Sequence, residues 1–362
     1  MTPFRLWFAR VVFLAALVVL AWGSSVASGT SRRALSDFDA GVAIVVPPGQ
    51  TCATWTPQAV PSIIPTAAGM PGPTVTPPPL APAVWAGVQF LGQEAESDWQ
   101  ALAAAGFGTA RVRVIQSGSE VPHAWIGREV ARAERYGTRV LLTFWVQGAG
   151  KIDVDCSTAS VAAYTVAVRE IARVYKGRIW AYQIDSEPDL CKASAASYSA
   201  RLIAAWQAIK AEDPKALVVM GGLAYETYAA PLTWLDDALR TLYGSRCWPC
   251  MDAIAVHSYA DDWGRWPGGL EGKLAAVRKR MKLWGLTLPV WVSEGGASSG
   301  PSNQWHERTP ATQAKLVADY LMRCRTLPLC VVFRATDGLE VDQYGIIGKP
   351  AMDAARKVLG DR

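Results

Sequence analysis

From residue 85 onward, short apolar runs rich in β-branched residues alternate with longer amphipathic stretches, and this alternation constrains the fold more than any other feature. The runs ALVVM and RVLLTF are apolar almost throughout, as in strands buried on both faces of a parallel sheet. The predicted strands are residues 85–91, 109–115, 139–145, 179–184, 216–222, 253–257, 289–293 and 330–334. The predicted helices are residues 97–105, 124–136, 161–175, 195–211, 232–242, 270–284, 310–325 and 350–359.

Eight successive strand–helix units within residues 85–362 predict an α/β fold of the (β/α)8 TIM-barrel class. An open, doubly wound sheet is the alternative, but eight even units of this length fit barrel closure better. The stretch WAGVQFLGQ around the first strand also lacks the G-x-G-x-x-G pattern of dinucleotide-binding folds.

The first 84 residues have a different composition and are predicted to lie outside the barrel. Residues 1–27 are predicted to be a signal peptide or a signal anchor, because Arg5 and Arg10 precede an apolar run at residues 11–22. Small residues up to Ala27 favour cleavage there, whereas an uncleaved segment would tether the protein to a membrane. Residues 28–84 are predicted to be a linker rich in Pro and Thr. We therefore expect an extracellular or cell-surface protein.

Export changes the interpretation of the seven cysteines, because an oxidising compartment permits disulfides. The expected pairs, which leave Cys52 over, are Cys247 with Cys250, Cys324 with Cys330, and Cys156 with Cys191. A zinc site at 247–250 is the alternative, but the sequence has no second Cys or Cys/His pair at similar spacing. With only three histidines in the chain, we predict no metal and no cofactor.

Net charge and tryptophan content indicate the kind of partner. A formal charge of +5 on 362 residues provides no reason to expect a nucleic-acid partner. Sixteen tryptophans are many, and the flat indole face suits stacking on sugar rings as well as packing in a large core. We expect an oligo- or polysaccharide substrate and a monomeric protein.

Two glutamates stand at the tips of predicted strands, where barrel enzymes place their active sites. Glu187 follows the fourth strand and Glu294 follows the seventh. These strands lie on opposite sides of an eight-stranded ring, so that the two carboxyl groups can face a sugar from either side. Glycoside hydrolysis requires such a pair, one group protonated and the other ionised.

Four motifs in the region from about residue 85 to 360 resemble the clan of retaining glycoside hydrolases that includes many cellulases, mannanases and xylosidases. In this clan, called clan A, the acid/base lies on strand four and the nucleophile on strand seven. IWAYQIDSEPD is similar to the clan's Asn-Glu-Pro strand end, and PVWVSEGG is similar to its strand-seven motif. GFGTAR supplies the glycine and the arginine of strand two, and His257-Ser-Tyr259 matches the end of strand six.

The resemblance implies Glu187 as acid/base and Glu294 as nucleophile. It also implies that Arg111 and Tyr259 hydrogen-bond Glu294, and that His257 lines the site. For the sugar-stacking platform, the position of the loops suggests three tryptophans: Trp145, Trp263 or Trp305.

The sequence departs from the clan pattern at two positions. Ser186 replaces the asparagine that contacts the substrate 2-hydroxyl, so we expect either reduced activity or a changed requirement at that hydroxyl. Phe333-Arg334 replaces the aromatic platform, often tryptophan, of strand eight.

The alternative function is a barrel without catalysis that binds surface polysaccharide or serves as a scaffold. Ser186 favours this alternative, whereas the presence of both Glu187 and Glu294 disfavours it. Geometry discriminates between the two, because a retaining hydrolase requires the two carboxyl groups within about 6 Å of each other.

Overall fold

The computed structural model describes residues 83–116, 121–146, 160–190, 194–224, 233–259, 267–300, 308–338 and 343–360. Within these residues, parallel strands form a closed barrel in sequence order, from β1 to β8 and back to β1. The strands are β1 (Ala83–Phe90), β2 (Phe107–Gln116), β3 (Arg139–Val146), β4 (Ala181–Ser186), β5 (Leu217–Leu223), β6 (Ala253–Tyr259), β7 (Val290–Gly296) and β8 (Cys330–Val332). The (β/α)8 class predicted from the alternation is therefore confirmed.

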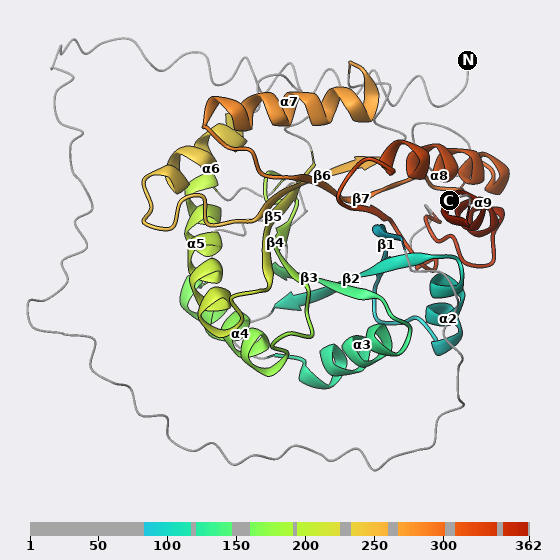
Figure 1. Cartoon of the computed structure of the whole chain (residues 1–362), viewed down its shortest axis with the longest axis horizontal. Coiled ribbons are helices and arrows are strands. Elements are labelled where there is room, and N and C mark those ends of the chain that lie inside the picture. Colours follow the sequence, from blue (N-terminus) through green and yellow to red (C-terminus); the bar gives the residue numbers. More distant parts are fainter. Residues whose placement is uncertain are drawn as a thin grey trace, which may run out of the picture. The chain divides into compact units, whose positions relative to one another are not determined.

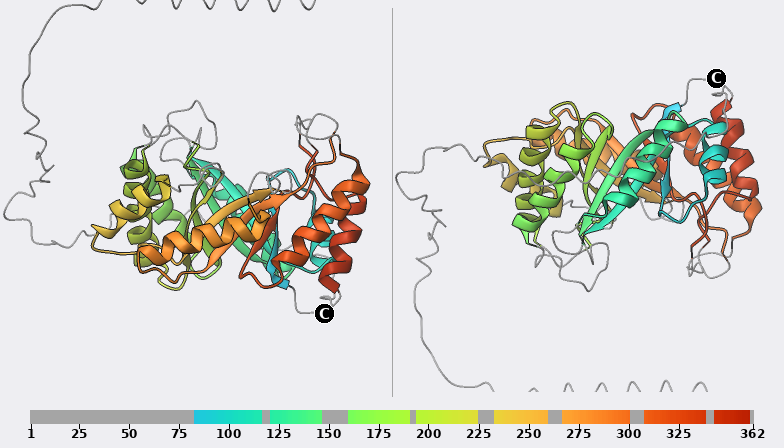
Figure 2. Two further views of the ribbon diagram at one scale, coloured as in Figure 1. Left: turned by 90° about the horizontal axis from the view of Figure 1, so that it is seen from above. Right: turned by 90° about the horizontal axis from the view of Figure 1, so that it is seen from below.

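The helices form an outer ring around the strands (Figure 1). They are α2 (Glu96–Ala104), α3 (His123–Arg135), α4 (Val161–Val174), α5 (Ala195–Glu212), α6 (Thr233–Tyr243), α7 (Gly269–Leu283), α8 (Pro310–Cys324) and α9 (Pro350–Gly360). The last two helices lie side by side at one edge of the barrel (Figure 2). Among the described residues, no helix is both long and apolar enough to span a membrane.

Side chains that cap the first backbone amides begin several of these helices. Ser160 caps α4 by accepting a hydrogen bond from the amide of Ala163, and Ser194 caps α5 in the same way. Thr309 caps α8, and Pro310 follows it at the first helical position, where its missing N–H costs nothing. The structure begins these three helices at the residues that the sequence predicted.

The barrel has two apolar layers, one inside the strands and one between the strands and the helices. The inner cluster contains Leu141, Val219, Trp291 and Val331 from four different strands. At the amino end of the barrel, the ring of Trp180 stacks on that of Trp291, with their centroids 4.9 Å apart. This packed interior closes the barrel below the carboxyl ends of the strands, so that chemistry is confined to those ends.

Six strands continue further toward their carboxyl ends than the sequence predicted, and three of them do so by two or three residues. β4 includes Ser186, β6 includes Tyr259, and β7 includes Glu294 and ends at Gly296. Strand pairing rather than hydrophobicity defines these ends, because polar residues there still form backbone hydrogen bonds with the neighbouring strands. The candidate side chains are thus mounted on rigid sheet. β8, by contrast, ends at Val332 and is shorter than predicted.

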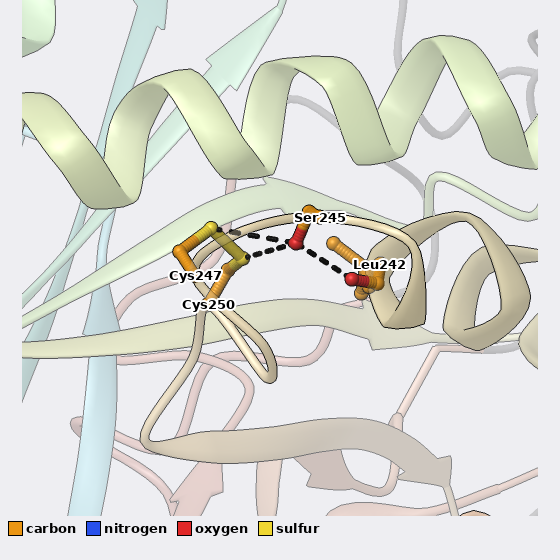
Figure 3. Close-up of a disulfide and its surroundings, with 4 residues drawn as sticks. All are labelled: Leu242, Ser245, Cys247 and Cys250. Carbon is orange, nitrogen blue, oxygen red and sulfur yellow. Dashed lines mark hydrogen bonds between the residues drawn. A yellow bond between two sulfur atoms is a disulfide. The ribbon is translucent and has the colours of Figure 1, made fainter.

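Two of the three expected disulfides are present, Cys247–Cys250 and Cys324–Cys330. The first closes the turn between α6 and β6, where Ser245 donates to the carbonyl of Leu242 at 2.6 Å and lies against both sulfur atoms (Figure 3). The first bridge lies just before β6, and the second includes the first residue of β8. Both therefore lie at the end of the barrel opposite the carboxyl ends of the strands. Cys156, Cys191 and Cys52 lie outside the described residues, as do the predicted leader and nearly all of the linker.

Candidate active site

Glu294 lies on β7 and receives hydrogen bonds on both carboxylate oxygens. Arg111 and Ser186 both donate to Oε1, the second at 3.2 Å, and the Arg111 contact is also an ion pair. Tyr259 donates to Oε2 at 2.7 Å. The structure therefore places Arg111 and Tyr259 against Glu294, as the sequence predicted.

Glu187 directly follows β4 and is the more accessible of the two carboxylates. Its side chain is 23% exposed, against 8% for Glu294. Its Oε1 shares a hydrogen bond of 2.8 Å with Nδ1 of His257, and its backbone amide donates to the carbonyl of Gly222 at 2.9 Å. His257 was expected near Glu294, but its shorter contact is with Glu187, since Nδ1 lies 3.7 Å from Oε2 of Glu294.

The two carboxyl groups and the ring of His257 lie close together. A carboxylate oxygen of Glu187, a carboxylate oxygen of Glu294 and a ring nitrogen of His257 all lie within 4.8 Å of one another. This separation meets the limit of about 6 Å set above for a retaining hydrolase. The three groups offer one ligand atom each to a metal ion, but such an ion would compete with the guanidinium that already pairs with Glu294.

The surroundings of the two carboxyl groups shift their pKa values in opposite directions. Burial is the largest influence on the pKa of Glu187 and raises it, and the nearby Glu294 adds to this effect, although the hydrogen bond with His257 opposes it. Burial would also raise the pKa of Glu294. However, the charges of His257 and Arg111 and the hydrogen bonds from Tyr259 and Arg111 outweigh burial and lower this pKa to about 2. Two carboxyl groups with separated pKa values can act as an acid and a nucleophile at the same pH.

Arg111 is held by two residues that the sequence analysis did not single out. Its NH1 donates to Gln89 on β1, and its Nε donates to Thr143 on β3 at 2.9 Å. All three side chains are fully buried. A signal was present in the sequence, because each partner is a polar residue within an apolar run, in WAGVQF and VLLTF. Such residues are expected to face a polar group of a neighbouring strand.

The tip of β4 has an unusual backbone, with positive φ at Asp185 (66°) and at Glu187 (52°). Non-glycine residues rarely adopt this conformation unless the surroundings impose it. Here the buried carboxylate of Asp185 accepts from Nε and NH2 of Arg201 on α5, at 3.2 and 3.1 Å. This ion pair holds the turn that presents Ser186 and Glu187.

Gly222 on β5 permits the close approach of His257 to the carboxylates. A Cβ atom at position 222 would lie 2.1 Å from Nε2 of His257 and 2.8 Å from Oγ of Ser293. Both atoms are buried without a hydrogen-bond partner among the described residues. The glycine is therefore needed for space rather than for backbone freedom, a requirement that the sequence does not reveal.

The predicted stacking residues have mixed outcomes. Trp145 lies at the end of β3, and the guanidinium of Arg113 covers one face of its ring at 4.2 Å from the centroid, which leaves at most the other face for a sugar. Trp263 and Trp305 lie outside the described residues. Near Glu294, the rings of Tyr259, Phe333 and Tyr344 pack edge to face, with centroids 5.4–5.8 Å apart.

Comparison with known proteins identifies the fold. No protein-family model matches the sequence, and sequence comparison finds no relative among curated proteins. Solved structures match well. A glucosidase from Croceicoccus marinus has a TM-score of 0.63 at 16% identity, over 76% of this chain and 66% of that longer chain. The chain thus shares its (β/α)8 barrel fold with this glucosidase.

Two further matches span nearly the whole of the compared structures. A GH113 β-1,4-mannanase has a TM-score of 0.52 at 13% identity, over 77% of this chain and 98% of its own. An endoglucanase from Pseudomonas stutzeri has a TM-score of 0.53 at 15% identity, over 76% of this chain and 94% of its own. The barrel alone accounts for these matches.

Proposed function

We propose that this protein is a retaining glycoside hydrolase that cleaves a β-linked glycan, with Glu187 as acid/base and Glu294 as nucleophile. The observation that carries the proposal is the pair of carboxyl groups within 4.8 Å whose pKa values are shifted apart. The glucosidase, mannanase and endoglucanase that share the fold support a glycan substrate.

In the first step, a carboxylate oxygen of Glu294 attacks the anomeric carbon as the bond from that carbon to the aglycone oxygen breaks. Glu187 transfers its proton to the departing oxygen, and a glycosyl ester with Glu294 forms. The raised pKa of Glu187 keeps the proton available, and the lowered pKa of Glu294 keeps the nucleophile ionised.

In the second step, Glu187 is ionised and removes a proton from water, whose oxygen attacks the anomeric carbon. The ester bond breaks, Glu294 recovers its negative charge and Glu187 recovers its proton. Two displacements at one carbon retain the configuration. Arg111 and Tyr259 stabilise the carboxylate before the first step and after the second, because both donate hydrogen bonds to it.

The alternative of a polysaccharide-binding barrel without catalysis is less well supported. A binding site gains nothing from bringing two acidic groups together, since their mutual repulsion costs stability. Here the repulsion is offset by a buried arginine and a histidine, which is the arrangement that catalysis requires.

The test is hydrolysis of a panel of 4-nitrophenyl β-glycosides and β-glucans by the full chain, with the configuration of the first product followed by NMR. We expect hydrolysis with a β-configured first product. Glu170→Gln is the matched control for substitution of Glu187 or Glu294 by glutamine, because Glu170 is a partly exposed carboxylate on α4 that pairs only with His123 among the described residues. An α-configured first product would contradict retention. Glycan binding without hydrolysis, unchanged by substitution of either proposed catalytic glutamate, would favour the binding barrel.

We also propose that the protein is exported and acts as a monomer at the cell surface or beyond. The basic and apolar leader supports export, and so do the two disulfides, which persist in oxidising compartments. Cell fractionation with an antibody would test the location. Mass spectrometry of the mature amino terminus would separate cleavage after Ala27 from retention of a membrane anchor.

A further inference from the structure

Ser186 directly precedes the proposed acid/base, Glu187, and its side chain contacts the proposed nucleophile, Glu294. Its hydroxyl takes part in two hydrogen bonds, one as donor and one as acceptor. The hydroxyl donates to Oε1 of Glu294 at 3.2 Å and accepts from NH2 of Arg111 at 3.2 Å. A serine hydroxyl has a single proton to donate. In this structure, that proton is directed to the nucleophile.

The position of this hydroxyl is imposed by its neighbours. Ser186 is only 5% exposed and is paired with Gly222 in the β4–β5 ladder. Asp185 before it is tied to Arg201, and the amide of Glu187 after it is tied to Gly222. The backbone on both sides of Ser186 is thus anchored, which holds its Cβ in place, and the contacts with Glu294 and Arg111 select the rotamer of its hydroxyl.

A bound substrate would have C2 of its sugar ring close to Ser186 and Glu294. In the proposed reaction the anomeric carbon contacts Glu294, and C2 is bonded to it, so the C2 substituent lies beside the same carboxylate. Glycosidases stabilise the transition state with hydrogen bonds to the 2-hydroxyl that strengthen as the reaction proceeds. A side chain whose proton is already bound to Glu294 does not donate to that hydroxyl without giving up the nucleophile.

We propose that Ser186 is a positioning residue that orients Glu294, and that the site consequently accepts glycosides altered at C2, with an axial, substituted or missing hydroxyl. The inference rests on the proposed glycosidase function and narrows its substrate class.

A cycle that combines a change in the enzyme with a change in the substrate tests this proposal. The substrates are the 4-nitrophenyl β-glycoside hydrolysed fastest in the panel, its 2-deoxy analogue and its C2 epimer. The variants are Ser186→Ala and Ser186→Thr, each checked for folding by its thermal unfolding. We expect Ser186→Ala to lower kcat/KM about 10- to 100-fold, and by the same factor on all three substrates, because the lost bond is to a charged group of the enzyme.

Three further results would support the proposal. Ser186→Thr, which keeps the hydroxyl, should recover most of the activity. The acid limb of the pH profile of Ser186→Ala should move to higher pH, because loss of a donor raises the pKa of Glu294. The unaltered chain should hydrolyse the analogues at rates within about tenfold of the rate for the parent glycoside. A site that hydrogen-bonds the 2-hydroxyl would hydrolyse the analogues far more slowly.

Two results would overturn the proposal. If Ser186→Ala slowed only the glycoside with an intact 2-hydroxyl, the serine would contact the sugar directly. If the unaltered chain rejected both C2 analogues, the predicted tolerance would be wrong.

Failure of the proposed function itself gives a different pattern, namely no hydrolysis of any glycoside by the unaltered chain. The positioning role is then measured by acid unfolding. Ser186→Ala should raise the pH midpoint of acid unfolding in the native chain but not in a chain that also carries Glu294→Gln. An equal shift in both backgrounds would contradict a role that acts through Glu294.

Discussion

The tips of β4 and β7 carry the same side chain in contrasting surroundings. Glu294 on β7 receives hydrogen bonds on both oxygens and pairs with the fully buried Arg111. Glu187 after β4 has His257 as its hydrogen-bond partner and lies beside the negative charge of Glu294. Burial raises the pKa of both acids, so the number and charge of the donors decide which of the two has the lowered pKa.

Substitution of Glu294 at the β7 tip should have the largest effect on activity. We expect Glu294→Ala to lower kcat/KM about 10⁴-fold or more, because removal of a nucleophile abolishes the covalent step. Added azide should restore turnover and yield a glycosyl azide of inverted configuration, which NMR can identify. If the azide product had the retained configuration, the roles of the two tips would be reversed.

The β4 tip should show a smaller loss that depends on the leaving group. For Glu187→Gln we expect a fall of about 10²- to 10⁴-fold on a glycoside with a poor leaving group, the range typical of a general acid. A 2,4-dinitrophenyl leaving group needs no proton, so its departure, measured as a pre-steady-state burst, should be nearly unaffected. An equal loss on both substrates would indicate that Glu187 is not the acid.

Substitutions at the two tips should also have different effects on the stability of the protein at neutral pH. Glu294→Gln leaves the charge of Arg111 buried without its partner, and we expect a loss of about 3 kcal/mol in the free energy of unfolding. Glu187→Gln should instead leave stability unchanged or raise it. Its raised pKa means that folding favours the neutral form, so the contribution of this group to stability is present at low pH and is lost as pH rises through the folded-state pKa.

Chemical denaturation at pH 7 measures both changes. Destabilisation by both substitutions to the same extent would show that the surroundings of the two tips do not differ energetically.

The smallest expected effect concerns His257, which contacts both glutamates. Its interactions lower the pKa values of both Glu187 and Glu294. Removing the imidazole in His257→Leu should therefore move both limbs of the bell-shaped pH dependence of kcat/KM to higher pH. Activity is lost above the pKa of Glu187 because the acid is deprotonated, and below that of Glu294 because the nucleophile is protonated. Movement of one limb alone would show that His257 serves a single carboxylate.

The fold could be read from the sequence because its signal is local and repeated. Continuous apolar runs such as ALVVM require burial on both faces, and serine and threonine caps mark the helix starts. Strand ends were less predictable, because the pairing of β4, β6 and β7 continues through polar residues that the hydrophobic pattern excludes.

Part of the site was equally readable. Glu187, Glu294, Arg111, His257 and Tyr259 were predicted from strand ends and motifs, and the structure brings them together. Their catalytic roles remain proposals.

The sequence by itself thus determined the barrel and the two acids at the carboxyl ends of its fourth and seventh strands. Only the tertiary structure showed why the pKa values of the two acids differ, because Arg111, Ser186 and Tyr259 reach Glu294 from three other strands. It also decided that Gln89 and Thr143 hold Arg111, and that Gly222 makes room for His257. The physical reason is that a pKa depends on charges and donors within a few ångströms, and a barrel brings such groups together from distant parts of the chain.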